Sequence, residues 1–242
     1  MTTRTDSNLT RTTYARIAGF MFLFYIAVGV TQIVVFGGTT AGERTAAKLA
    51  SMAQHATDVR IDAMLGLLTC FIALILAVAL YAITREQDSN LAMLGLICRV
   101  GEGVIGGVYI PMTLGLLSLA TARGANAPDS AATHALGSFL LAAQSWTPNI
   151  AGTFFAVGST AFSWLLLRGR MIPVALAWLG VLASILWAVG LPLQLIGVLP
   201  DSVTWFIYLP MAAFEIPLGL WLLIKGVAVP ASSAAPLSVG DY

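Results

Sequence analysis

The amino-acid sequence predicts an all-α polytopic membrane protein with six transmembrane helices and two amphipathic helices on its outer surface. Hydrophobic residues make up 58% of the chain, charged residues make up only 10%, and the mean hydropathy is +0.88. A soluble domain is about a quarter charged. The apolar residues occur in runs that reach the roughly 20 residues needed to cross a bilayer. The chain is therefore divided into membrane spans rather than into soluble domains.

The predicted spans follow from the apolar runs and from the polar turns between them. They are residues 15–36, 59–83, 91–118, 146–167, 172–198 and 203–224. The first run is too long for the apolar region of a signal peptide, and no A-x-A site follows it, so we expect an uncleaved helix. Residues 1–14 and 227–242 are predicted to be disordered tails on either side of a membrane domain at 15–226.

The turn after the first span is predicted to lead into a short amphipathic helix. Thr40-x-x-Glu43 has the pattern of a capping box, in which each side chain bonds the backbone N–H of the other residue. Apolar residues then recur at helical spacing from Ala46 to Ala56. We expect such a helix to lie on the outer membrane surface.

The apolar pattern that ends at Leu167 is too long for one span. We divide it into a second surface helix at residues 131–145 and a fourth span that begins with Trp146. A tryptophan fits the aromatic belt at the membrane interface. Pro148 fits the first turn of a helix, where a missing N–H costs nothing.

Six spans place both termini on the same side of the membrane, and the positive charges indicate which side this is. Seven Lys and Arg residues fall on the side of the termini: Arg4, Arg11, Arg16, Arg85, Arg168, Arg170 and Lys225. Four fall on the other side: Arg44, Lys48, Arg60 and Arg123. Because cytoplasmic loops carry the excess of Lys and Arg, we expect both termini to be cytoplasmic.

Composition and motifs argue against several functions. A net charge of +1, with Lys and Arg scattered over the loops, does not give the basic face that a nucleic-acid partner requires. Cys70 and Cys98 lie inside spans without ligand spacing, so we expect buried thiols and neither a metal nor a cofactor. The sequence has no H-E-x-x-H, G-x-S-x-G or Walker pattern, which argues against an enzyme.

Charged side chains inside the spans are the candidate functional residues, because a charge in hydrocarbon is costly and usually has a role. Arg99 and Glu102 in the third span are three residues apart and share a helix face. Glu215 and Tyr25 lie at a similar depth, roughly 15 Å from the inner surface at a rise of about 1.5 Å per residue. These four residues are the candidates for a ligand- or ion-binding site near the midplane.

The charges support two interpretations that the sequence leaves open. One arginine beside two carboxylates leaves an excess negative charge, and a buried carboxylate without a partner usually takes up a proton. Glu102 or Glu215 could then exchange a proton or cation in a site that binds or moves a small solute, a proton or a lipid. Alternatively, the charges only clamp helices together in a non-catalytic scaffold or partner subunit.

Other residues in the spans add secondary features. Arg60 and Asp62 are secondary site candidates at the outer end of the second span, where long side chains can reach the headgroups. Small residues such as those of Gly103-x-x-x-Gly107 let helices pack closely, within the protein or in an oligomer. Pro210 and Pro217 bracket Glu215, and a helix break there could free carbonyl groups beside the carboxylate.

Several short motifs occur in an order that resembles a known bacterial family. They are Ala15-Arg16-Ile17-Ala18-Gly19, Thr45-Ala46-Ala47-Lys48-Leu49-Ala50, Cys98-Arg99-Val100-Gly101-Glu102, and Glu215 followed by Leu220-Trp221-Leu222-Leu223-Ile224-Lys225-Gly226. Over most of residues 15–226 the chain is similar to the domain-of-unknown-function family 4386. The resemblance implies a small multi-pass protein of the bacterial inner membrane and supports the charged pattern, but it implies no activity. The family often has an acidic residue in the second span where this chain has Gly66, one turn after Asp62.

Overall fold

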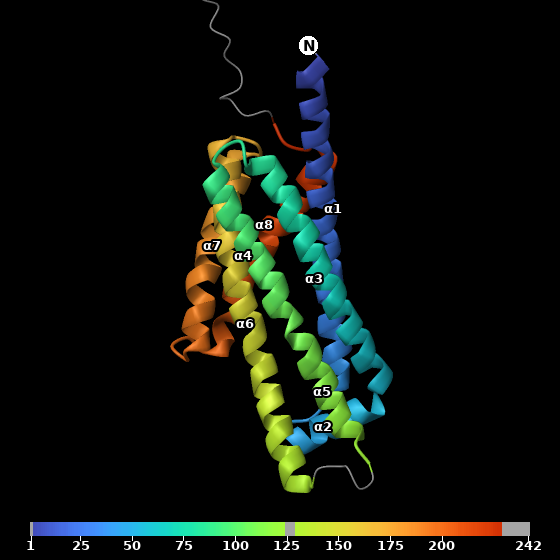
Figure 1. Ribbon diagram of the computed structural model, residues 1–242. Helices are drawn as coiled ribbons and strands as arrows, with labels where there is room; N and C mark the ends of the chain where they lie inside the picture. Colours follow the sequence, from blue (N-terminus) through green and yellow to red (C-terminus); the bar gives the residue numbers. More distant parts are fainter. Residues whose placement is uncertain (1, 124–128, 229–242) are drawn as a thin grey trace, which may run out of the picture.

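The computed structural model describes residues 2–123 and 129–228, with all of their side chains except those of residues 2–9 and Asp201. Within this part, six helical segments are long and apolar enough to cross a membrane. They are Thr10–Thr39, Ala56–Thr84, Ser89–Thr121, Ser130–Arg168, Val174–Leu195 and Thr204–Ile224. The predicted all-α architecture with six spans is confirmed (Figure 1).

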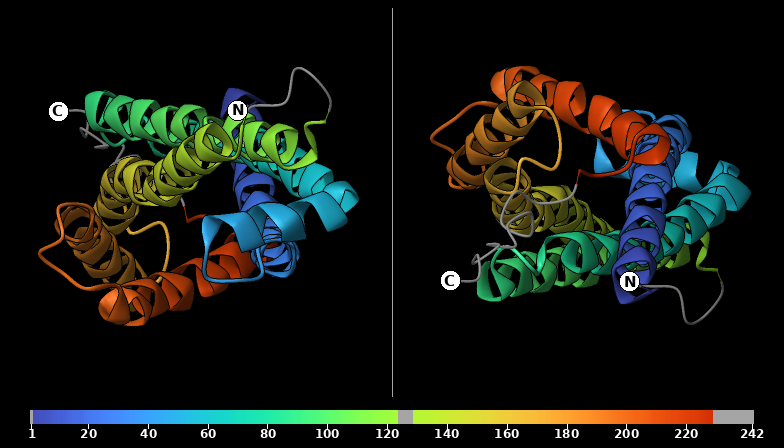
Figure 2. Two further views of the ribbon diagram at one scale, coloured as in Figure 1. Left: turned by 90° about the horizontal axis from the view of Figure 1, so that it is seen from below. Right: turned by 90° about the horizontal axis from the view of Figure 1, so that it is seen from above.

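The helices form a closed ring. In chain order they are α1 (Thr2–Thr39), α2 (Thr45–Gln54), α3 (Ala56–Thr84), α4 (Ser89–Gly107), α5 (Tyr109–Thr121), α6 (Ser130–Arg168), α7 (Val174–Leu195), the short 3-10 helix η1 (Asp201–Val203) and α8 (Thr204–Ile224). α1 packs against α3, α3 against α4, α4 against α6, α6 against α7, α7 against α8, and α8 returns to α1. The end-on views show this circular arrangement (Figure 2).

Buried apolar side chains fill the ring at the end where α1 begins and α8 ends. The larger core cluster includes Ala15 of α1, Ile83 of α3, Leu166 of α6 and Leu222 of α8. The α3–α4 and α6–α7 turns lie at this same end (Figure 1), as expected for an even number of spans. Hydrophobic packing therefore closes the ring here, and we refer to this end as the terminal end.

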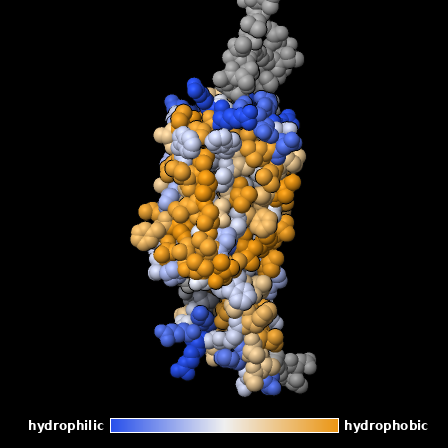
Figure 3. All heavy atoms as spheres, turned by 90° about the vertical axis from the view of Figure 1, so that its left-hand side faces the viewer, coloured by the Kyte–Doolittle hydropathy of each residue, from blue (hydrophilic) through white to orange (hydrophobic). Residues whose placement is uncertain are grey.

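The ring helices differ in length, so only some of them build the opposite end. α7 and α8 have 22 and 21 residues, enough for roughly 30 Å of apolar thickness. α6 has 39 residues and extends well beyond the α7–α8 turn (Figure 1). On the face shown in Figure 3, hydrophobic side chains form a belt over the part of the molecule that α7 and α8 share, with polar residues above and below it. The chain is thus shaped as an integral membrane protein.

Residues 131–145 do not form a separate surface helix, so this prediction is wrong. α6 is one helix from Ser130 to Arg168 and contains Pro148 in its interior. One turn before this proline, Gln144 is buried and donates a 2.7 Å hydrogen bond to Thr113 of α5. Contact with α5 therefore supports a continuous helix across a proline that local rules place at a helix start.

The predicted capping box is also wrong, although the short helix after it exists as α2. α2 begins at Thr45, and no side chain caps its amino end. The Thr40 hydroxyl instead donates to the Phe36 carbonyl oxygen at the end of α1. The buried residues Leu49 and Met52 of α2 belong to a small core cluster that also contains residues of α5, so α2 covers the end of the ring opposite the terminal end.

Prolines interrupt one span and leave another intact. The third span is divided at Val108, between α4 and α5, because Pro111 cannot donate to the carbonyl of Gly107 one turn earlier. α8, in contrast, is continuous through Pro210 and Pro217. The helix break that these prolines could have introduced around Glu215 is therefore not present.

The first helix starts earlier than predicted. α1 begins at Thr2 and runs through residues that were predicted to be a disordered tail. Contacts of Arg11 fix the last part of this unexpected helical segment against α3. The Arg11 Nη2 donates a 2.9 Å hydrogen bond to the Ile83 carbonyl, and the Arg11 Nη1 contacts Glu86 at 3.1 Å. The predicted tail at the other end falls almost entirely on residues 229–242, which lie outside the described residues.

Candidate functional site

The centre of the candidate site is an ion pair within α4. Nη1 of Arg99 lies 2.8 Å from Oε2 of Glu102, one helical turn away, and both side chains are buried. The other oxygen of this carboxylate, Oε1, accepts a 2.7 Å hydrogen bond from the hydroxyl of Tyr25 on α1. Three of the four predicted site residues therefore meet at one carboxylate.

Arg99 is almost completely enclosed, with 1% of its surface exposed. Its guanidinium lies 4.5 Å from the centroid of the Phe155 ring on α6 and 5.8 Å from that of Tyr25, which are cation–π distances. Nε and Nη2 have no hydrogen-bond partner within the described part of the chain. Gly158 of α6 leaves room for the arginine side chain, because a Cβ added at Gly158 would lie 3.1 Å from the Cγ of Arg99.

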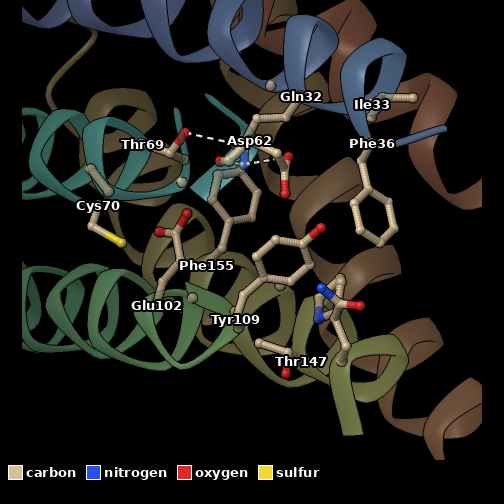
Figure 4. Close-up of a pocket in the computed structure, with 18 of the residues that line it drawn as sticks. Gln32, Ile33, Phe36, Asp62, Thr69, Cys70, Glu102, Tyr109, Thr147 and Phe155 are labelled. Atoms are coloured by element: carbon tan, nitrogen blue, oxygen red, sulfur yellow. Dashed lines mark hydrogen bonds between the residues drawn. The ribbon is translucent and has the colours of Figure 1, made fainter. Parts of the chain in front are cut away.

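A cavity of about 610 Å³ lies on one side of Glu102. All eight α-helices contribute to its walls, and Figure 4 shows part of this lining. On α1 the lining residues run from Tyr25 to Phe36, in the half of the helix that faces away from the terminal end. Ile33 lines the cavity and is 74% exposed, and Lys48 of α2 also lines it. The cavity therefore extends from the buried charges to the molecular surface near α2.

Glu215 lines the same cavity but does not join the ion pair. It is 9% exposed, and neither an ion pair nor a hydrogen bond connects its side chain to any residue that the structure describes. The predicted cluster is thus divided. Arg99 neutralises Glu102 and does not line the cavity, whereas Glu215 borders the cavity without a partner.

Asp62 lies inside the protein, not at the headgroup level where it was predicted. It has 0% exposure and lines the cavity. Its Oδ1 accepts a long 3.5 Å hydrogen bond from Nε2 of Gln32, and the Tyr109 side chain also interacts with the carboxylate. The Gln32 Oε1 in turn accepts a 3.0 Å bond from Thr69, and the Tyr109 ring lies nearby (Figure 4).

Arg60, the other secondary candidate, is exposed and does not line the cavity. Sequence reasoning missed Gln32, Thr69 and Tyr109, which surround Asp62. A usable signal existed for Gln32, because it follows Tyr25 by two helical turns and a polar amide inside an apolar span requires a partner. Thr69 gave no comparable signal, since a threonine hydroxyl can bond the carbonyl of its own helix, as it does here to Leu65.

The walls of the cavity combine charged and apolar side chains. The lining residues combine buried carboxylates with many apolar and aromatic side chains, the usual composition of a pocket for a small molecule. Within the described residues, no group of three or more His, Cys, Asp or Glu side chains is placed to hold a metal ion.

Comparison with known proteins gives one match. The family model described as "Domain of unknown function (DUF4386)" matches residues 17–226. No curated protein and no solved structure matches the chain.

Proposed function

For this chain, which belongs to the DUF4386 family, we propose that it is an integral membrane protein that binds a small solute in the cavity inside its helix ring. The single observation that carries the proposal is Glu215. A carboxylate that is nine-tenths buried normally has a partner, since burying it without one costs several kcal/mol. Its position on the cavity wall supports a solute as the missing partner, of which a proton is the smallest.

The size and enclosure of the cavity support this function. Small-molecule sites have volumes of about 300–1,000 Å³, and this cavity has about 610 Å³. It is preformed, because the residues around it belong to long helices rather than to loops. The packed core at the terminal end blocks a continuous path through the ring. In this conformation a solute would therefore enter and leave near α2.

The Arg99–Glu102 pair has a different role in this proposal. Both residues lie on one helix, Arg99 is enclosed by α6 through Phe155, and Glu102 accepts a bond from Tyr25 of α1. The pair therefore holds α1, α4 and α6 together at mid-depth. This contact is the observation that favours the scaffold function as the second candidate, because a clamp of this kind needs no solute.

A cavity-filling variant tests the proposal. A Cβ at Gly29 meets nothing within 4 Å, and Gly29 lines the cavity, so Gly29→Leu should occupy cavity space without a clash. Gly37→Leu is the matched control, because Gly37 on the same helix is equally open and does not line the cavity. The probe is the fluorophore aminoanthracene, titrated into the purified full-length protein in lipid nanodiscs.

We expect saturable fluorescence enhancement with the natural protein and with Gly37→Leu, and at least about a tenfold weaker affinity with Gly29→Leu, since roughly 1.4 kcal/mol of lost contact is tenfold. Equal behaviour of the three proteins, together with no reaction of Cys70 on the cavity wall with N-ethylmaleimide, would show a closed interior. The scaffold function would then be the better description.

A further inference from the structure

The charges that face the cavity are unbalanced. Three carboxylates line it, those of Asp62, Glu102 and Glu215. Arg99 pairs with Glu102 from outside the cavity wall. Among the described lining residues, the basic side chain is that of Lys48, on α2 near the opening of the cavity. Glu215 is on α8, across the ring from the buried pair on α4. Asp62 and Glu215 therefore form no ion pair with a basic residue that the structure describes, and Arg99 acts on Glu215 only through its longer-range electrostatic field.

One wall of the cavity is a continuous group of aromatic rings. The Trp187 ring lies 5.2 Å from that of Phe155 and 4.3 Å from that of Tyr208, between centroids, and all three residues line the cavity. Trp187 is fixed in place, because its Nε1 donates a 2.7 Å hydrogen bond to the Ile207 carbonyl. Phe155 already contacts one cation, the Arg99 guanidinium, so this wall suits positive charge.

The aromatic wall and the unpaired carboxylate are close along α8. Tyr208 and Glu215 are seven residues apart and share a face of the helix, two turns from one another. An aromatic face and a carboxylate together are the recurring elements that recognise ammonium groups. Across the cavity, the Asp62 carboxylate, which interacts with Gln32 and Tyr109, offers a second acceptor.

We propose that the solute is an organic cation, a small amine with an apolar body whose ammonium group lies at Glu215 and whose body lies on the Phe155–Trp187–Tyr208 wall. This proposal rests on the proposed function that the cavity binds a solute. An organic cation fits better than a metal ion, because no three His, Cys, Asp or Glu side chains of the described residues are grouped to hold a metal and the walls are largely apolar. An anion would meet three carboxylates.

Cys70 provides a probe of the charge inside the cavity. It lines the cavity beside Glu102 (Figure 4), and the other cysteine, Cys98, is buried and does not line it. In the full-length Cys98→Ala protein, the reaction rate of Cys70 is measured with cationic (trimethylammonium)ethyl methanethiosulfonate and with anionic sulfonatoethyl methanethiosulfonate. Each rate is divided by the rate at which the same reagent reacts with mercaptoethanol in solution, which removes the intrinsic difference in reactivity between the two reagents.

The expected normalised preference for the cation is about tenfold or more, because unscreened carboxylates act strongly in a low-dielectric cavity. Glu215→Gln should reduce this preference several-fold. Glu86→Gln, which removes an exposed carboxylate at the terminal end, should leave it unchanged. Asp62→Asn is the second variant, for use if Glu215→Gln does not fold.

Protection of Cys70 by a bound ligand then tests directly whether the solute is an organic cation. Benzyltrimethylammonium should protect Cys70 from N-ethylmaleimide, and its neutral isostere neopentylbenzene should protect at least about tenfold less well. Equal protection by the two compounds and equal normalised rates for the two charged reagents would overturn the organic-cation class while leaving solute binding intact. No reaction of Cys70 with N-ethylmaleimide would instead contradict the proposed function itself.

Discussion

The Tyr25 hydroxyl on α1 donates a 2.7 Å hydrogen bond to Glu102 on α4, and this bond joins two helices that are separated in the ring by α3. The other oxygen of the same carboxylate contacts Arg99. Glu102 is therefore occupied on both sides by residues of the protein, whereas Glu215, at a similar depth, is not. This distribution of partners and the packing around it lead to testable predictions for the stability of the protein.

Removing only the hydroxyl tests the contribution of the Tyr25 bond. Tyr25→Phe keeps the ring beside Arg99 and should lower the free energy of unfolding by about 1 kcal/mol, the usual size for a hydrogen bond between membrane helices. The measurement is reversible unfolding of the full-length protein in mixed micelles. Tyr81→Phe is the control, because no hydrogen bond of the Tyr81 side chain is present in the described residues, and it should have no effect. An equal loss in both variants would refute the assigned bond.

Removing Arg99 should be much more damaging, because it leaves Glu102 buried beside apolar groups. Arg99→Met is expected to cost about 3–5 kcal/mol in the free energy of unfolding. The double variant Arg99→Met with Glu102→Gln should recover most of this loss, since no uncompensated charge remains. If the double variant is as unstable as the sum of the two single variants, the residues are not coupled.

An exposed pair gives the comparison for that experiment. Arg168 and Asp88 lie 3.8 Å apart with both side chains partly exposed, so Arg168→Met should cost less than about 1 kcal/mol. A similar cost for Arg99→Met and Arg168→Met would mean that the α4 pair does not stabilise the ring.

The tightest contact between α1 and α8 depends on a glycine. A Cβ at Gly19 would lie 2.6 Å from the Gly219 carbonyl oxygen and would also meet the Leu223 backbone. Backbone cannot move aside as a flexible side chain can, so Gly19→Leu should destabilise the fold by about 3 kcal/mol, the upper part of the usual range for overpacking. The loss is measured as a lower unfolding temperature in detergent. Gly37→Leu, with open space around its Cβ, should leave the temperature unchanged.

The sidedness of the membrane domain is tested with single cysteines. In a background with Cys70→Ala and Cys98→Ala, Glu43→Cys lies near α2 and Glu86→Cys lies in the α3–α4 turn at the terminal end. With cytoplasmic termini, as the distribution of Lys and Arg predicts, a membrane-impermeant maleimide should label Glu43→Cys in intact cells and Glu86→Cys only after permeabilisation. The reverse labelling pattern would invert the predicted orientation.

The sequence by itself determined what depends on the chain in isolation. Six apolar runs specify six spans, because backbone in hydrocarbon must satisfy its own hydrogen bonds as helix. The pairing of Arg99 with Glu102 also follows from the sequence, because residues three apart on a helix are neighbours. Depth along each helix likewise placed Tyr25 and Glu215 at the level of this pair, through the constant rise per residue.

Only the tertiary structure decided which groups face one another. Rotation of each helix about its axis is set by packing, so the sequence did not determine that Asp62 points into a cavity while Arg60 remains exposed. Contacts with other helices also override local signals, which is why α6 continues through Pro148. The lack of an ion pair at Glu215 arises in the same way, because the packing of α8 in the ring does not bring this carboxylate within ion-pair distance of Arg99.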